Sequence, residues 1–200
     1  MVKRLRDWPR LPILGAVLGE EFAAVLASAK QGNEAAFALL WRDSNPALLR
    51  YLRVLAPSVA EDVAAETWLQ VVRGLAGFRG DEQAWRAWLF TTCRRRAIDD
   101  GRRRARRQAE SLSDISDETL PGAADTADLA LEHLATERAL ALVARLPAAQ
   151  AEVILLRVVA GLDTVAVAEL VGRSPAAVRV AAHRGLRRLA RVLAEAGVTL

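Results

Sequence analysis

Apolar residues recur every three or four positions along most of this chain, a spacing that predicts helices rather than strands. The clearest case lies near the C-terminus, where the apolar positions are Val178, Ala182, Leu186, Leu189 and Leu193. Basic side chains occupy the opposite side, at Arg179, His183, Arg184, Arg187, Arg188 and Arg191. We therefore expect a helix with one face in a core and a cationic face toward solvent.

Two features in front of this helix predict a tight turn from a shorter helix over 164–170. Gly172 can adopt the left-handed backbone conformation, which lets the chain leave one helix at a steep angle. Ser174 can cap the next helix, and Pro175 suits its first position because proline has no amide proton. The pattern is typical of a helix-turn-helix, whose second helix lies in the DNA major groove. A merely solvated arginine-rich face is the alternative at this point.

Helical spacing also runs through the N-terminal half. It predicts one helix over 21–29 and a second that is capped by Asn33 and places Phe37, Leu40 and Trp41 on one face. A third is predicted over 46–55 and a fourth from Val59 onward. Trp85, Trp88, Leu89 and Thr92 recur at the same spacing, and we expect Trp88 and Leu89 in the core. The glycines at 74, 77 and 80 predict a flexible, exposed loop from Arg79 to Gln83.

The charge of the chain changes sign within a short distance. Residues 94–107 include eight arginines in fourteen positions, a density that favours an anionic partner. Residues 108–128 have no basic residue and carry carboxylates at Glu110, Asp114, Asp117, Glu118, Asp125 and Asp128. We predict an N-terminal extension over 1–20, a helical domain over 21–107, a flexible acidic linker over 108–128 and a second helical domain over 129–200.

Composition supports an all-α protein with a nucleic-acid partner. Only Lys3 and Lys30 are lysines among 28 basic residues, so arginine dominates, whose planar donors suit phosphates and guanine edges. Cys93 is the single cysteine, which excludes an intramolecular disulfide and favours a cytoplasmic protein. Pro12 interrupts the one signal-like apolar run, and no stretch approaches the ~20 apolar residues that span a membrane. We expect no membrane insertion.

Two carboxylates four residues apart, Asp62 and Glu66, share one predicted helix face. Such a pair can serve acid–base catalysis or form half a metal site, but no histidine or further carboxylate lies at ligand spacing. We therefore expect no catalytic site, no metal and no cofactor. The face is either solvated or a docking surface for a basic partner.

Three motifs, in order along the chain, resemble the sigma-70 family of bacterial RNA polymerase sigma factors. The stretch AEDVAAETWLQVV, 60–72, resembles the helix that grips the polymerase clamp. The pattern FRG-x4-W-x2-WLF-x7-ID, 78–99, is similar to the segment that opens and reads the downstream promoter element. The segment from Leu146 to Leu189 resembles the promoter-binding C-terminal domain. The two-lobe form with a short linker resembles the compact extracytoplasmic-function branch.

The resemblance implies roles for individual residues. Docking on the clamp helices of the largest subunit of core RNA polymerase would use Asp62, Glu66, Trp68 and Leu69. Reading and melting of the −10 element would use Phe78, Arg79, Trp85, Arg94, Arg95, Arg96, Asp99, Arg102 and Arg103, with a flipped base received by the 79–83 loop. Contacts with the −35 element would come from Arg173, Ser174, Ala176, Ala177, Arg179, Val180, His183, Arg184 and Arg187. The acidic linker would thread the polymerase channels.

The chain departs from the family pattern in two places. Arg95 occupies a position where the family often has an asparagine linked to base contact. The recognition helix offers few side chains that can bond base edges, which leaves Arg173 and Arg179 as the candidates for guanine. We therefore predict that the −35 element is read largely through DNA shape and phosphate contacts.

Two other functions compete with this interpretation. A stand-alone helix-turn-helix regulator would use the C-terminal lobe alone and leaves 32–107 unexplained. An RNA-binding or scaffolding protein would use the arginines of 94–107, with salt-dependent binding indifferent to sequence. The resemblance also implies an anti-sigma protein that covers the 62–72 face or wedges between the lobes.

Overall fold

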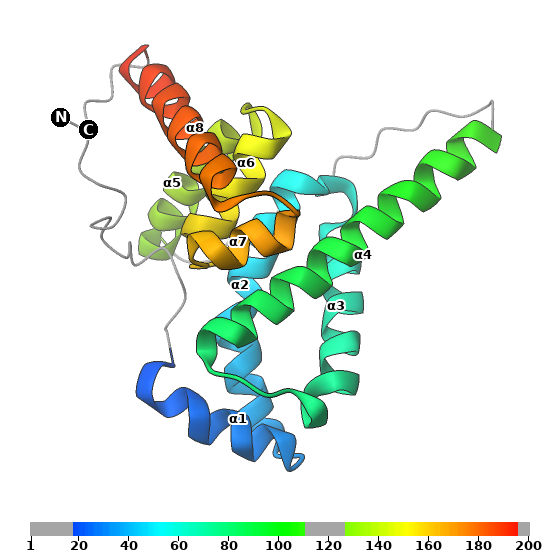
Figure 1. The fold of residues 1–200 in the computed structure, drawn as a ribbon. Helices are drawn as coiled ribbons and strands as arrows, with labels where there is room; N and C mark the ends of the chain where they lie inside the picture. The colour runs from blue at the N-terminus through cyan, green and yellow to red at the C-terminus, as the bar shows by residue number, and fades with distance from the viewer. Residues whose placement is uncertain (1–17, 111–126, 196–200) are drawn as a thin grey trace.

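The computed structural model describes residues 18–110 and 127–195, and every regular element in these ranges is helical, which confirms the all-α class (Figure 1). The helices are α1 (Phe22–Lys30), α2 (Glu34–Leu55), α3 (Ala60–Gly74), α4 (Glu82–Glu110), α5 (Ala127–Ala144), α6 (Ala148–Ile154), α7 (Thr164–Val171) and α8 (Pro175–Glu195). We call α1–α4 the N-lobe and α5–α8 the C-lobe. The expectations for most of the N-terminal extension and of the acidic linker fall outside the described residues.

Helix α2 runs without a break through Pro46, whereas the sequence pattern predicted two separate runs. Proline removes one amide donor inside a helix and usually costs about 3 kcal/mol. Here Leu40 on one side of it and Leu48 on the other are fully buried. Their burial offsets the lost bond, because each fully buried leucine contributes roughly 1.5–3 kcal/mol. The cap expected at Asn33 is present, since its Oδ1 accepts from the Ala36 amide at 3.1 Å.

An aromatic cluster forms the centre of the N-lobe. Trp85 is 1% exposed and lies within 6.5 Å, ring centre to ring centre, of four other rings. These rings belong to Phe22 of α1, Trp68 of α3, Phe78 of the loop before α4, and Trp88 of α4. The cluster therefore fastens the loop before α4 to two other helices.

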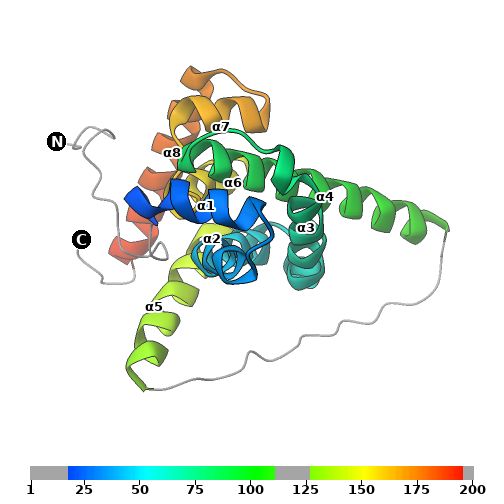
Figure 2. The ribbon, with the colours of Figure 1, turned by 90° about the horizontal axis from the view of Figure 1, so that it is seen from below.

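The two lobes pack against each other along α2 and α4 (Figures 1 and 2). Helix α2 contacts α5 and α6, and α4 contacts α7. Glu152 of α6 accepts hydrogen bonds from Arg94 Nε of α4 at 2.7 Å and from Tyr51 Oη of α2 at 3.2 Å. Arg53 of α2 donates to Glu137 of α5 at 3.3 Å. The structure is thus a closed arrangement in which the half-buried carboxylate of Glu152 bridges the lobes.

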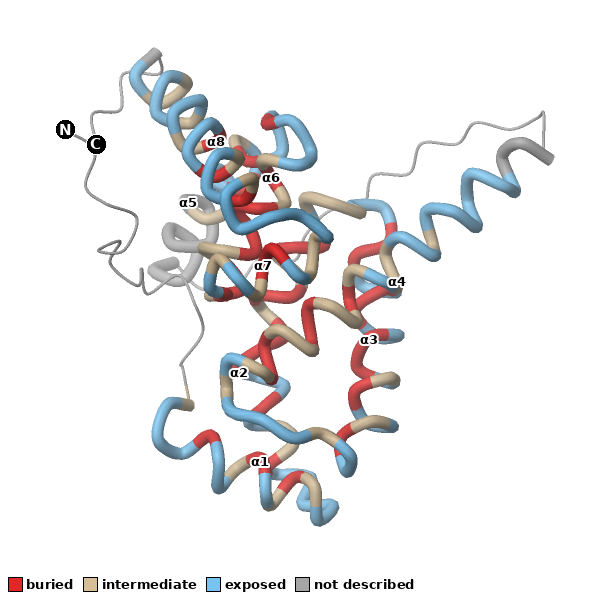
Figure 3. The backbone as a smooth tube through the Cα atoms, viewed as in Figure 1, coloured by how far each residue is buried: buried red, intermediate tan, exposed pale blue. Residues whose placement is uncertain are grey.

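The C-terminal end of helix α4 projects beyond the other helices of both lobes (Figures 1 and 2). Every residue over 101–107 is exposed, as is much of α8 (Figure 3). Within the described residues, no helix is both long enough and apolar enough to cross a membrane.

Candidate DNA-binding and docking surfaces

The turn between α7 and α8 has the local geometry that the sequence predicts. Gly172 lies in the left-handed region with φ 67°, and Ser174 Oγ accepts from the Ala177 amide at 3.2 Å. One cap escaped the sequence analysis: Asp163 Oδ1 accepts from two amides at the start of α7, both at 2.8 Å. The Asp-Thr pair before an apolar run is a readable cap signal. These local bonds set the angle at which α8 leaves α7.

We expect opposite effects on stability from alanine at two exposed glycines. Gly172→Ala should destabilise the protein by about 1–2 kcal/mol, because a side chain disfavours the left-handed conformation. Gly101→Ala in α4 should stabilise it by about 1 kcal/mol, because the new methyl group meets no other atom there and alanine favours a helix. Urea unfolding of both variants measures the difference. Equal midpoints would contradict the strained turn.

The face of α8 that the sequence assigns to the −35 element is open. Among its assigned residues, only Ala177 is half-buried. The others are exposed: Arg173, Ser174, Ala176, Arg179, Val180, His183, Arg184 and Arg187. Val178 and Ala182 of the opposite stripe are buried in the C-lobe. In the part of the chain that the structure describes, the arginines of this face form no ion pair. The surface can therefore meet phosphates without first breaking an internal bond.

The loop before α4 is short and held by hydrogen bonds. Helix α4 begins at Glu82, inside the range expected to be a loop, because Asp81 Oδ1 caps it by accepting from the Ala84 amide at 2.9 Å. Lys30 Nζ donates to the Phe78 carbonyl at 2.9 Å. The Phe78 ring stacks on Trp88 with centres 5.1 Å apart. Between these anchors, the exposed Arg79 donates to the Phe78 and Ala76 carbonyls.

The structure corrects the role expected for Trp85. Its ring is buried and its Nε1 donates to Ser44 Oγ at 3.2 Å, so it does not present a face to a base. Helical spacing placed Trp85 and Trp88 on one side but did not show that α1 and the 78–81 loop cover Trp85. Trp88, half-buried and stacked on Phe78, is the more accessible of the two rings.

The arginines of α4 differ in how free they are. Arg94 is bound to Glu152 of the C-lobe, and this hydrogen bond raises the pKa of its guanidinium. Arg96 donates to Gln70 at 3.1 Å and lies 3.9 Å from Glu66. Arg95 and Asp99 are exposed, as are Arg102 and Arg103, which pair with Asp99 and Asp100 one turn earlier. Arg94 can therefore join the expected DNA surface only when the lobes part, because in the closed arrangement its guanidinium is bound to Glu152.

The outer face of α3 combines charge and apolar surface. Asp62 and Glu66 are exposed, and Leu69 is 53% exposed beside them. Trp68 is instead buried, with its Nε1 donating to Asn45 Oδ1 at 2.9 Å, so it supports the face from behind. Sequence reasoning missed Trp41 of α2, a large ring that is 42% exposed. Because Trp41 recurs at helical spacing with core residues, the sequence pattern did not show that its ring is exposed.

A further apolar hollow lies between the start of α2 and the end of α3. It has a volume of about 340 Å³ and is lined by Phe37, Val72 and Leu75, among others. Val72 is 54% exposed and lies one turn beyond Leu69. The apolar surface thus continues from α3 toward α2, and contiguous exposed apolar surface is a feature of protein-binding sites in general. In the described residues, no three His, Cys, Asp or Glu side chains gather as a metal site.

Cys93 is fully buried in α4, and we expect its thiol to stay unreactive in the folded protein. Burial raises the pKa of this thiol to about 12. Since an exposed thiol has a pKa of about 8.5, a disulfide reagent at pH 8 should react roughly a thousandfold more slowly than in urea. The folded pKa is the higher one, so this group stabilises the fold below pH ~8.5 and loses that effect as the pH rises toward 12. Equal rates in native buffer and urea would contradict the burial.

Comparison with known proteins links both lobes to one family. The model described as Sigma-70 region 2 matches residues 40–107, and that described as Sigma-70, region 4 matches residues 136–189. Together they cover more than half of the chain. The ECF RNA polymerase sigma factor SigD of Mycobacterium tuberculosis is 33% identical over 189 residues, which are 90% of this chain and 87% of SigD. ShbA of Streptomyces griseus is also 33% identical, over a stretch that covers 86% of this chain and 94% of the ShbA chain.

Two solved structures share the fold. CnrH, in complex with the cytosolic domain of CnrY, has a TM-score of 0.58 at 21% identity, covering 88% of this chain and 99% of CnrH. RpoE from Bartonella quintana, in complex with the anti-sigma factor NepR, has a TM-score of 0.59 at 23% identity, covering 78% of this chain and 96% of RpoE.

Proposed function

Because the chain belongs to the sigma-70 family of RNA polymerase sigma factors, in its extracytoplasmic-function branch, we propose that α3 docks it on core polymerase while α4 and α8 read the promoter. As a sigma factor, it binds core RNA polymerase, recognises −35 and −10 promoter elements and promotes transcription initiation. The observation that carries this function is the presence of both family regions in order, each on one lobe with an exposed basic helix.

The docking surface consists of Asp62, Glu66, Leu69, Val72 and Trp41. Its two carboxylates suit a basic partner, and its exposed apolar side chains supply area that water leaves on binding. We assign it to the clamp helices of the largest polymerase subunit. Trp68 positions the surface through its bond to Asn45 rather than by contact with the partner.

The −10 element is assigned to the loop before α4 and to the exposed arginines that follow. The Phe78 and Trp88 rings are stacked and only half-buried beside the loop, where a flipped base can be held against them. Arg95, Arg102 and Arg103 are exposed along α4 and can meet the phosphates of the melted strand. Unstacking a base costs a few kcal/mol, which stacking on aromatic rings and the phosphate contacts together can offset.

For the −35 element, we expect Arg179→Ala and Arg187→Ala to separate base reading from phosphate binding. Loss of Arg179 should cost about 1–3 kcal/mol of discrimination at one guanine. Loss of Arg187 should weaken all sequences alike and reduce the salt dependence by about one charge. Anisotropy titrations with matched and substituted duplexes measure both. Equal weakening of all sequences by Arg179→Ala would show that it does not read a base.

We propose that the protein performs no chemistry of its own and acts in the cytoplasm, where its partners are. An anti-sigma factor is a further proposed partner, since CnrH was solved with CnrY and RpoE with the anti-sigma factor NepR. A stand-alone regulator is not favoured, because the region 2 match over 40–107 has no role in it.

Reconstituted transcription tests the function. The purified chain is added to bacterial core RNA polymerase with a library of genomic promoter fragments, and the transcripts are sequenced. We expect transcripts that depend on the chain and share two spaced elements upstream of their starts. Binding to core without such transcripts would overturn promoter recognition, and no binding to core would overturn the sigma function as a whole.

A further inference from the structure

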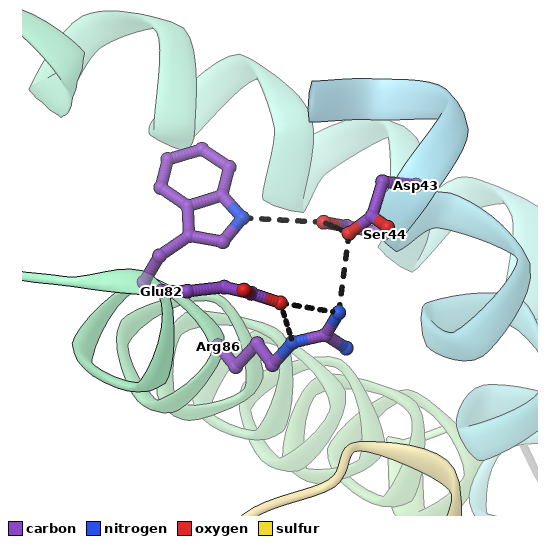
Figure 4. Close-up of polar contacts among 5 residues, drawn as sticks. Asp43, Ser44, Glu82 and Arg86 are labelled. Carbon is purple, nitrogen blue, oxygen red and sulfur yellow. Dashed lines mark hydrogen bonds and ion pairs between the residues drawn. The ribbon is translucent and has the colours of Figure 1, made fainter. Parts of the chain in front are cut away.

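Arg86 lies buried one turn into α4, between two carboxylates (Figure 4). Its Nη2 donates to Glu82 Oε1 at 3.0 Å and to Asp43 Oδ2 of α2 at 3.3 Å, and its Nε donates to Glu82 Oε1 at 3.1 Å. The Arg86 and Asp43 side chains are 5% and 6% exposed, and the Glu82 side chain is 19% exposed. Arg86 therefore joins the first residue of α4 to the middle of α2.

A neutral bond lies beside this ionic one. Ser44, next to Asp43, accepts from the indole Nε1 of Trp85 at 3.2 Å (Figure 4). The Trp85 ring centre is 5.7 Å from that of Phe78, where the loop before α4 begins. Two adjacent residues of α2 thus hold two adjacent residues of α4, close to the loop assigned to the −10 element.

The ion pairs of Arg86 with Asp43 and Glu82 add little net stability, because the cost of burying the charges offsets most of their attraction. Removing three charges from water is costly, and well-packed apolar side chains of the same volume often stabilise a fold as well or better. One oxygen of the Asp43 carboxylate is moreover buried without a hydrogen-bond partner. A directional bond of this kind is better suited to fixing a position than to holding the fold together.

We propose that Arg86 is a positioning residue for base capture, which acts through Glu82 and Asp43 to hold the 78–81 loop in register with the flipped base. The inference rests on the proposed −10 role of that loop. Arg86 itself is 4% exposed, so it is placed to hold the loop rather than to contact DNA. A shift of about 1 Å in a positioned group can weaken its action by up to about a hundredfold, so a small displacement of the loop has a measurable effect.

The test is a triple variant, Asp43→Asn, Glu82→Gln, Arg86→Met, in which no buried charge is left without a partner. It is assembled with core polymerase, and its affinity for a single-stranded oligonucleotide with the −10 sequence of a transcribed promoter is measured by anisotropy. We expect binding about tenfold weaker or more, with core affinity and thermal midpoint unchanged. Arg86→Lys, which keeps the cation, should retain part of the affinity.

Thr67→Ala is the matched control, since it breaks a buried hydrogen bond of the N-lobe, from Thr67 Oγ1 to the Val63 carbonyl at 2.7 Å within α3, at a residue that has no role in docking or base capture. We expect it to lower the thermal midpoint and to keep the oligonucleotide affinity. Wild-type affinity in the triple variant, or equal weakening by Thr67→Ala, would show that Arg86 is only structural. If the wild-type holoenzyme transcribes but does not bind the oligonucleotide, the −10 assignment of the loop fails, and the positioning role with it.

Discussion

Replacing Asp62 and Glu66 together by arginine is expected to abolish co-elution of the chain with core RNA polymerase on gel filtration. Both carboxylates are exposed on α3, so the change turns an acidic face into a basic one. Like charges placed together at an interface cost several kcal/mol, which corresponds to a loss of affinity of at least about a hundredfold. The fold should survive, because the one ion pair that either group makes with the described residues, Glu66 with Arg96 at 3.9 Å, is partly exposed and contributes little.

The variant Glu20→Arg, Glu21→Arg carries the same change of charge and is the control. These two carboxylates are exposed ahead of α1, away from α3, and neither makes a side-chain cap bond there. Co-elution should persist. Retained binding by the Asp62 and Glu66 variant would show that the docking surface lies elsewhere, and loss in both variants would point to a general charge effect.

How much the sequence predicted depends on the range of the interactions involved. The caps at Asn33 and Ser174 and the turn at Gly172 depend on neighbours within four residues, and all three are present. The continuous α2 was missed because the packing that tolerates Pro46 comes from residues distant in sequence. A pattern of single residues does not contain that information.

The candidate surfaces show the same division. The exposed face of α8 follows from one helical stripe and was readable from the sequence. Trp85 and Trp41 were assigned less well, because a tryptophan at helical spacing is covered or exposed according to which other elements pack over it. The bond between Arg94 and Glu152 joins residues 58 positions apart, so no local sequence pattern predicts it.

Glu152→Ala is expected to shift the protein from the closed arrangement toward an open one. Promoter elements near −35 and −10 lie about 25 base pairs apart, about 85 Å of DNA at 3.4 Å per base pair. Helix α4, by contrast, is 29 residues long, about 43 Å at 1.5 Å per residue, and it contacts α7 directly. The lobes must therefore part before both elements are read, which also frees Arg94.

The size of the shift follows from the bonds that Glu152 makes. It accepts from a cation and from the buried hydroxyl of Tyr51, and hydrogen bonds to charged groups contribute about 1.5–3 kcal/mol each. A loss of about 2 kcal/mol changes the ratio of closed to open protein by roughly thirtyfold. Glu137→Ala is the control, because its bond to Arg53 is about half exposed and should contribute under about 1 kcal/mol.

Energy transfer between dyes on Ala105→Cys of α4 and Ala190→Cys of α8 measures the separation. Both positions are exposed, and the native Cys93 is buried and should not be labelled. We expect lower transfer efficiency in Glu152→Ala and wild-type efficiency in Glu137→Ala. On binding core polymerase and promoter DNA, the transfer efficiency should fall in both variants. Unchanged efficiency in Glu152→Ala would show that the apolar contacts of α2 with α5 and α6 hold the lobes together without this carboxylate.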